Sequence, residues 1–122
     1  MAQKILIVED DTFLQGLASN KLSKEGFEVT TAPDGTEAIK LLATLTPDII
    51  LLDLVLPGLD GFGVLKQVRE NEATKSIPVI VFSNLAQDED IKKAKDLGAN
   101  DFMIKSNFTL DELAEKIKGM LG

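Results

Sequence analysis

The chain has 122 residues, 44% of them hydrophobic, and a net charge of −7. This length and apolar content suit one domain with one core, and the acidic balance argues against a nucleic-acid or anionic membrane surface. No apolar run approaches the roughly 18 residues of a membrane span, and cysteine and histidine are absent, which removes thiol chemistry and the commonest zinc ligands. We expect one cytoplasmic domain over residues 1–122, without a signal peptide, because the chain enters an apolar run at once.

Apolar runs and turn residues predict strands and helices in alternation through the first half of the chain. Asp11 suits the N-cap of the first helix, and Gly26 suits its end. The third run is apolar at every position, which is typical of a strand buried on both faces of a parallel sheet. The first helix carries, at roughly helical spacing, Phe13, Leu14, Leu17 and Leu22. Strands are expected at residues 4–8, 27–31 and 49–52, the second near an edge, and helices at residues 12–25 and 36–45.

The second half of the chain repeats this alternation. Pro57-Gly58 and Asp60-Gly61 form turns after the third strand, and Thr109 with Glu112 fits a capping box before the last helix. Strands are expected at residues 78–82 and 100–104, and helices at about residues 60–68, 87–97 and 110–120. The order βαβαβαβαβα therefore predicts an α/β domain whose parallel sheet is covered by helices on both faces.

Chemically capable side chains follow the ends of four predicted strands. Glu9 and Asp10 follow the first strand, Asp53 the third, Ser83 the fourth and Lys105 the fifth. The carboxyl ends of parallel strands share one edge, and a strand order of 2-1-3-4-5 makes the first and third strands neighbours. Three carboxylates crowded there would repel one another. A hard cation such as Mg²⁺ resolves this conflict, because it binds carboxylates, waters and a phosphate oxygen.

Such a group of side chains can support phosphoryl chemistry. A carboxylate can act as the nucleophile and form an aspartyl phosphate, while the metal and a lysine neutralise the phosphoryl oxygens. A hydroxyl that bonds only the modified form can bias a two-state segment. Taken singly, Asp10 is more simply a helix cap, Ser83 a loop residue and Lys105 a solvated charge. The specific signal is their combination, in this order, on four strand ends.

These motifs together resemble the receiver domain of bacterial two-component response regulators, over essentially the whole chain. The resemblance rests on residues 5–11, on Asp53 with residues 56–61, on residues 79–83 and on residues 98–105. It implies a flavodoxin-like doubly wound (βα)5 sandwich with a five-stranded parallel sheet of order 2-1-3-4-5. It also implies a phosphohistidine donor on a sensor histidine kinase or phosphotransfer protein, and a downstream protein target that reads the surface of the fourth helix, fifth strand and fifth helix.

The resemblance assigns a role to each residue of the group. Asp53 would be the phosphoacceptor, and Ser83 with Phe102 the hydroxyl and aromatic switch pair. Lys105 would contact the phosphoryl group. Mg²⁺ would be held by Asp10 and Asp53 directly, by Glu9 through water, and by the backbone carbonyl of Val55.

Two positions depart from the family pattern. Proline usually follows the lysine, often after a cis peptide bond, but Ser106 stands there. A cis bond without proline costs roughly 3 kcal/mol, so either the loop differs or local contacts hold it. A small residue usually follows the switch hydroxyl, and here Asn84 would modulate access to Asp53, slowing phosphoryl entry or hydrolysis. Neither departure removes a residue that the chemistry needs.

Three functions remain open at this point. We favour a phosphorylation-controlled signalling domain that is not an enzyme beyond its own phosphorylation and dephosphorylation. A Mg²⁺-dependent phosphatase or phosphotransferase could use the same aspartate, but the short loops offer no segment to enclose a substrate. A receiver-like binding domain that no longer uses phosphate finds support only in Asn84 and Ser106.

Overall fold

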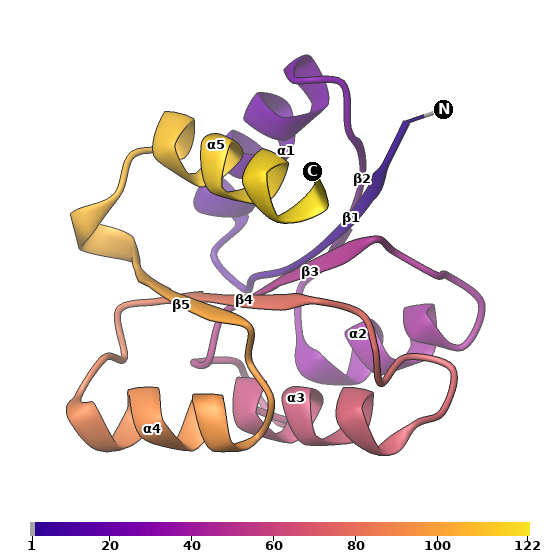
Figure 1. Cartoon of the computed structure of the whole chain (residues 1–122), viewed down its shortest axis with the longest axis vertical. Helices are drawn as coiled ribbons and strands as arrows, with labels where there is room; N and C mark the ends of the chain where they lie inside the picture. The colour runs from indigo at the N-terminus through magenta and orange to yellow at the C-terminus, as the bar shows by residue number, and fades with distance from the viewer. Residues whose placement is uncertain (1) are drawn as a thin grey trace.

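The computed structural model describes residues 2–122, and its centre is a five-stranded parallel sheet (Figure 1). The strands are β1 (Lys4–Val8), β2 (Glu28–Ala32), β3 (Ile49–Leu52), β4 (Val79–Ser83) and β5 (Asp101–Ile104). Their order is β2-β1-β3-β4-β5, which confirms the predicted topology and the edge position of β2. β3 has no exposed residue, as a central strand beneath two helical layers requires.

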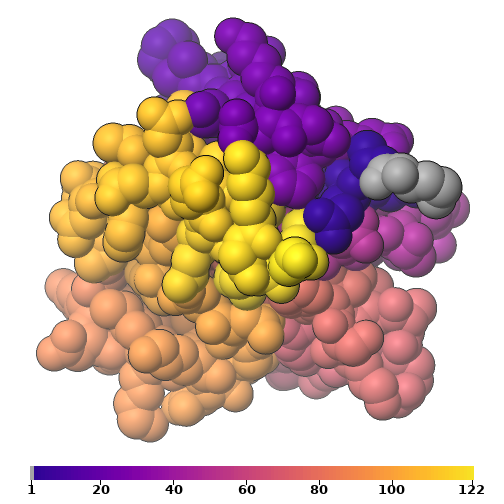
Figure 2. Space-filling model, turned by 45° about the horizontal axis from the view of Figure 1, so that its top comes forward, coloured from indigo at the N-terminus to yellow at the C-terminus, as the bar shows by residue number. Residues whose placement is uncertain are grey.

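Helices cover both faces of the sheet. The helices are α1 (Thr12–Lys24), α2 (Gly35–Leu42), α3 (Gly61–Glu70), α4 (Asp88–Asp96) and α5 (Leu110–Leu121). α1 and α5 lie on one face, while α2, α3 and α4 lie on the other (Figure 1). Figure 2 shows α5, in yellow, packed beside the purple α1. Each face of the sheet has its own core, one built around Leu6, Ile50 and Leu65 and the other around Ile7, Leu51 and Ile117.

Side-chain caps fix where the helices begin. The Asp11 carboxylate accepts hydrogen bonds from the backbone N–H groups of Phe13 and Leu14, as predicted. Thr109 and Glu112 form the predicted capping box at the start of α5. Each cap satisfies N–H groups that lack a partner within the helix. The two caps therefore help to fix where α1 and α5 begin.

The boundaries of the expected strands and helices are confirmed to within a few residues. Two other features differ from expectation: how much of the α1 stripe is buried, and a short helix after β5. Along α1, Phe13 is 75% exposed and Leu17 is 42% exposed, whereas Leu22 is buried. Helical spacing indicates a stripe of side chains but not how much of it is covered, and here only part of that stripe meets the core. A short 3₁₀ helix, η1 (Lys105–Asn107), also lies between β5 and α5, where the sequence indicated a loop. No helix within residues 2–122 combines the length and the hydropathy of a membrane span.

Candidate functional site

Strand register brings two buried carboxylates to the same level of the sheet. Val8 pairs with Leu52 between β1 and β3, so the next residues, Glu9 and Asp53, are neighbours. The Asp53 N–H donates to the Val8 carbonyl at 3.0 Å, which extends the pairing by one step. Glu9 is only 5% exposed and Asp53 only 6% exposed. Both carboxylates are therefore withdrawn from most of the solvent that would stabilise their charge.

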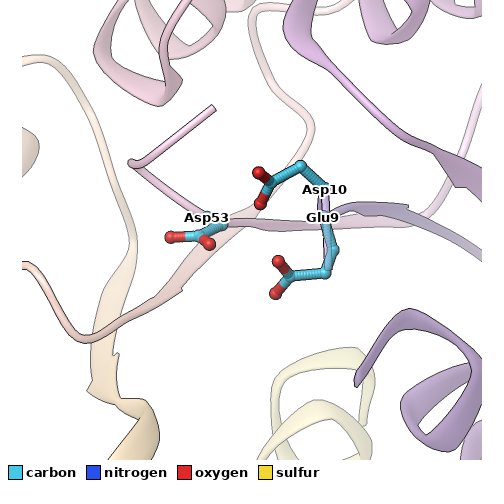
Figure 3. Close-up of side chains that lie close together, drawn as sticks. All are labelled: Glu9, Asp10 and Asp53. Atoms are coloured by element: carbon cyan, nitrogen blue, oxygen red, sulfur yellow. The ribbon is translucent and has the colours of Figure 1, made fainter. Parts of the chain in front are cut away.

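Asp10 completes a group of three carboxylates. One carboxylate oxygen from each of Glu9, Asp10 and Asp53 lies within 4.8 Å of the others. Figure 3 shows the two residues from the end of β1 and the one from the end of β3 around a common space. Unlike the other two, Asp10 is exposed, so the group opens to solvent on its side. The three acidic residues predicted to meet at this edge do so.

Lys105 is held between the two buried carboxylates. Its Nζ lies 2.6 Å from Glu9 Oε1 and 2.8 Å from Asp53 Oδ2. Burial by itself lowers the pKa of Lys105, but the hydrogen bonds to Asp53 and Glu9 outweigh burial and raise that pKa. Burial raises the pKa of Glu9, and the Lys105 hydrogen bond opposes this effect only in part. The ammonium therefore stays charged and compensates two carboxylates at once.

The donor atoms of this group suit a magnesium ion. All three side chains offer carboxylate oxygens, which are the ligands that a hard divalent cation prefers, and one of them faces solvent, where bound waters can remain. Val55 follows Asp53 by two residues, and its N–H donates to Asp53 Oδ1 at 3.2 Å. This bond keeps the Val55 backbone beside the carboxylates, as a carbonyl ligand from that residue requires.

The two residues expected to act as a switch lie on neighbouring strands. Ser83 ends β4 and is fully buried, and its Oγ accepts a hydrogen bond from the Leu85 N–H at 3.2 Å. Phe102 on β5 pairs with Val81 and is only partly buried. Its ring packs against a small cluster that includes Leu54, next to Asp53 in the chain. Phe102 also lines a groove of about 530 Å³ between β5 and α5.

Asn84 and Ser106, which depart from the family pattern, form a hydrogen bond with each other. Asn84 Oδ1 accepts from the Ser106 N–H at 3.0 Å. Residues 2–122 contain no cis peptide bond, so Ser106 follows Lys105 through a trans bond and the loop differs from the usual pattern. The sequence motifs do not indicate this contact, because neither residue type signals a hydrogen bond between two loops that are 22 residues apart in the chain.

Sequence reasoning also missed a role for Gly61. A Cβ atom on Gly61 would lie 2.3 Å from the Asp53 carbonyl oxygen and 2.5 Å from the Leu54 Cα. The start of α3 therefore packs directly against the backbone that carries Asp53. In the sequence, the Asp60-Gly61 pair indicates only a turn. The one signal that Gly61 could pack against the site was its closeness to Asp53 in the chain.

Known proteins share both the sequence pattern and the fold. Residues 5–118 match the family described as the response regulator receiver domain, and the chain belongs to this family. The DNA-binding dual master transcriptional regulator RpaA of Synechocystis is 37% identical over 118 residues, which are 97% of this chain and 48% of RpaA. The chain thus spans about half the length of the curated relatives it matches.

Two solved structures show similar domains in modified states. The phosphorylated cyanobacterial phytochrome response regulator RcpA is 35% identical, with a TM-score of 0.85 over 98% of this chain and 91% of RcpA. The BeF3-activated N-terminal receiver domain of RstA from Klebsiella pneumoniae is 28% identical, with a TM-score of 0.89 and 98% coverage of both chains. The fold class expected from the sequence, flavodoxin-like with sheet order 2-1-3-4-5, is confirmed.

Proposed function

We propose that this receiver domain accepts a phosphoryl group on Asp53 from a phosphohistidine of a partner protein, and that the modified domain controls protein partners. The observation that carries the proposal is the buried Asp53 carboxylate, held between the Lys105 ammonium and two further carboxylates. The donor would be a sensor histidine kinase or a phosphotransfer protein, which places the reaction in the cytoplasm. The phosphorylated state of RcpA and the BeF3-activated state of RstA support the proposal by similarity.

The transfer moves one phosphoryl group from nitrogen to oxygen. A carboxylate oxygen of Asp53 attacks the phosphorus atom, the P–O bond forms and the P–N bond breaks. The electron pair of that bond returns to the imidazole nitrogen, which accepts a proton as the donor leaves. Mg²⁺ held by Glu9, Asp10, Asp53 and the Val55 carbonyl would supply positive charge for the phosphoryl oxygens.

Lys105 would supply a second positive charge for the phosphoryl oxygens, from a side chain of the protein itself. Its ammonium contacts Asp53 Oδ2 at 2.8 Å, so it would pair with a phosphoryl oxygen attached to the same carboxylate. The Val55 N–H holds Oδ1 at 3.2 Å and orients the carboxylate. Hydrolysis would reverse the modification, with water as the acceptor of the phosphoryl group.

The phosphoryl group would change a surface at some distance from Asp53. A hydrogen bond from the Ser83 hydroxyl to the group would draw the end of β4 toward β3, and Phe102 would adjust on the neighbouring strand. The groove of about 530 Å³ along β5 and α5, lined in part by Phe102 and Phe108, offers partners a surface that depends on the Phe102 ring. The net charge of −7 favours protein partners over direct contact with nucleic acid.

The direct test is phosphorylation by a small donor. The protein is incubated with Mg²⁺ and acetyl phosphate, and intact mass is measured for the wild type, Asp53→Asn and the exposed control Asp96→Asn. We expect one added phosphoryl group in the wild type and the control, none in Asp53→Asn, and none when EDTA removes Mg²⁺. An unmodified wild type at saturating donor, or continued modification of Asp53→Asn, would overturn the proposal.

A further inference from the structure

The two departures from the family pattern are complementary. Asn84 supplies a side-chain oxygen, and Ser106 supplies the backbone N–H that this oxygen accepts, at 3.0 Å. A proline at position 106 would have no N–H to donate, and an alanine at position 84 would have no oxygen to accept. Each departure from the usual residues is thus matched by the other.

This hydrogen bond lies where the sheet ends. β4 and β5 are paired as far as Ser83 and Ile104, after which β4 continues into a loop and β5 into η1. The Asn84 side chain takes the place of a strand carbonyl and continues the connection past the last pair. Two segments that would otherwise separate are thereby joined.

We propose that Asn84 and Ser106 are a positioning pair, whose hydrogen bond sets the spacing between the Ser83 hydroxyl and the Lys105 ammonium. This inference rests on the proposed function, in which those two groups bind the phosphoryl group on Asp53. Asn84 directly follows Ser83, and Ser106 directly follows Lys105, so this bond between the Asn84 side chain and the Ser106 backbone links the two segments that carry those groups.

The benefit of this bond comes from pre-organisation. A phosphoryl group needs the hydroxyl and the ammonium at the same time, and ordering two separate loops costs conformational entropy. The Lys105 ammonium is already positioned by its contacts with Glu9 and Asp53, but these contacts do not involve β4. The Asn84–Ser106 hydrogen bond ties the loop after β4 to the segment that carries Lys105, so both are ordered before the phosphoryl group binds.

The hydrogen bond itself can be tested without any phosphoryl chemistry. Amide hydrogen exchange of the Ser106 N–H is measured by NMR in the wild type, Asn84→Ala, Asn84→Leu and Asn84→Asp. We expect faster exchange in the alanine and leucine variants, which lack an acceptor, and near wild-type protection in the aspartate variant, which keeps one. Unchanged protection in Asn84→Ala would overturn the inference.

The positioning role is tested with beryllium trifluoride and Mg²⁺ as a stable stand-in for the phosphoryl group. Affinity is measured by calorimetry, because the chain has no tryptophan or tyrosine to report binding. We expect Asn84→Ala and Asn84→Leu to weaken binding by about threefold to tenfold, the value of one hydrogen bond. Ser106→Ala keeps the backbone N–H and should bind like the wild type. Thermal unfolding in the absence of ligand separates this effect from simple loss of stability.

Two results would contradict the positioning role. If Asn84 acts only as an obstacle, Asn84→Leu will bind like the wild type and Asn84→Ala will bind at least as tightly. If the two residues act independently, Asn84→Ala will have the same effect in a Ser106→Pro background as in the wild type, whereas a shared bond makes that effect disappear. A wild type that binds no beryllium trifluoride refutes the proposed function, while failure of the variants alone refutes only this inference.

Discussion

The ammonium of Lys105 lies 2.8 Å from Asp53 Oδ2, although 52 residues separate the two in the chain. The same ammonium is 2.6 Å from Glu9 Oε1. One cation therefore compensates two buried carboxylates on neighbouring strands. Lys105 should therefore contribute to the stability of the metal-free domain, in addition to its role in the proposed phosphoryl chemistry.

Replacing Lys105 by methionine should destabilise the metal-free protein. Two buried carboxylates would lose their counter-charge, and breaking a buried pair costs about 3 kcal/mol. Mg²⁺ should restore more free energy of unfolding in Lys105→Met than in the wild type, because the ion no longer shares the carboxylates with an ammonium. Urea unfolding with and without Mg²⁺ measures both quantities.

Lys116→Met is the matched control for that experiment. Lys116 pairs with Asp101, but both side chains are partly exposed, at 45% and 30%, so solvent screening reduces the cost to about 1 kcal/mol or less. Equal losses in the two variants, or no loss in Lys105→Met, would contradict the role given to the ammonium.

Asp10→Asn should separate metal binding from folding. Asp10 is exposed, and no ion pair involves it in the part of the chain that the structure describes. We expect metal-free stability close to that of the wild type. Mg²⁺ affinity should fall by about tenfold or more, since one anionic ligand is lost. Calorimetric titration with Mg²⁺ gives the affinity, and wild-type affinity in the variant would exclude Asp10 as a ligand.

Gly61→Ala should disturb the backbone at Asp53. The new methyl group would lie 2.3 Å from the Asp53 carbonyl oxygen, so either β3 or the start of α3 must move, at a cost of about 1–3 kcal/mol. We expect lower stability and slower phosphorylation by acetyl phosphate. Denaturant unfolding and intact mass over time measure the two effects.

Gly16→Ala provides the matched control. Gly16 lies in α1, and an added Cβ would meet nothing within 4 Å outside its chain neighbours and the backbone of its own helix, so alanine should raise stability by about 0.5–1 kcal/mol through its better helix propensity. Its phosphorylation rate should equal that of the wild type. If Gly61→Ala behaves in the same way, the close packing against Asp53 has no consequence.

Acid should weaken the contact between α1 and α5. The Lys118 hydrogen bond lowers the pKa of Glu25 below its ordinary value of 4.5, and the Lys21 hydrogen bond lowers the pKa of Asp111 below 3.8. A carboxyl group with a lowered folded-state pKa stabilises the fold above its unfolded pKa, and this contribution is lost as the pH falls through the folded-state value. A Glu25→Gln/Asp111→Asn variant should therefore melt below the wild type at neutral pH.

The difference in Tm between that variant and the wild type should begin to shrink as the pH falls below 4.5 for Glu25 and below 3.8 for Asp111, and should vanish once the pH is below their lowered folded-state pKa values. It should also shrink in high salt, because these side chains are partly or fully exposed and salt screens their attraction. Thermal melts across a pH series measure the difference. A difference that persists in strong acid would point to packing rather than charge as its cause.

Local patterns in the sequence were sufficient to predict the fold and much of the site. Each strand and helix has its own periodicity and end signals, and a parallel sheet must bring the strand ends that carry Glu9, Asp53 and Lys105 to one edge. The bond between Asn84 and Ser106 was not predictable in this way. It depends on how two loops leave the sheet, and neither residue type carries a signal for such a contact. The ion pair between Lys105 and Glu9 was not predicted either, because a shared edge brings charged side chains near one another without specifying which of them pair.

Asp53 follows the middle strand of the sheet, whereas Phe102 lies on β5, which has a neighbouring strand on one side only. The central strand β3 is hydrogen-bonded to a neighbour on both sides, whereas the edge strand β5 is hydrogen-bonded on one side only. Strands with a single neighbour open locally more easily than a strand paired on both sides, and of the two edge strands, β2 and β5, only β5 carries a residue expected to act in the switch. The phosphoacceptor expected at Asp53 thus stands at the end of a strand that is supported on both sides, and the aromatic residue expected to respond stands on one of the two least-supported strands of the sheet.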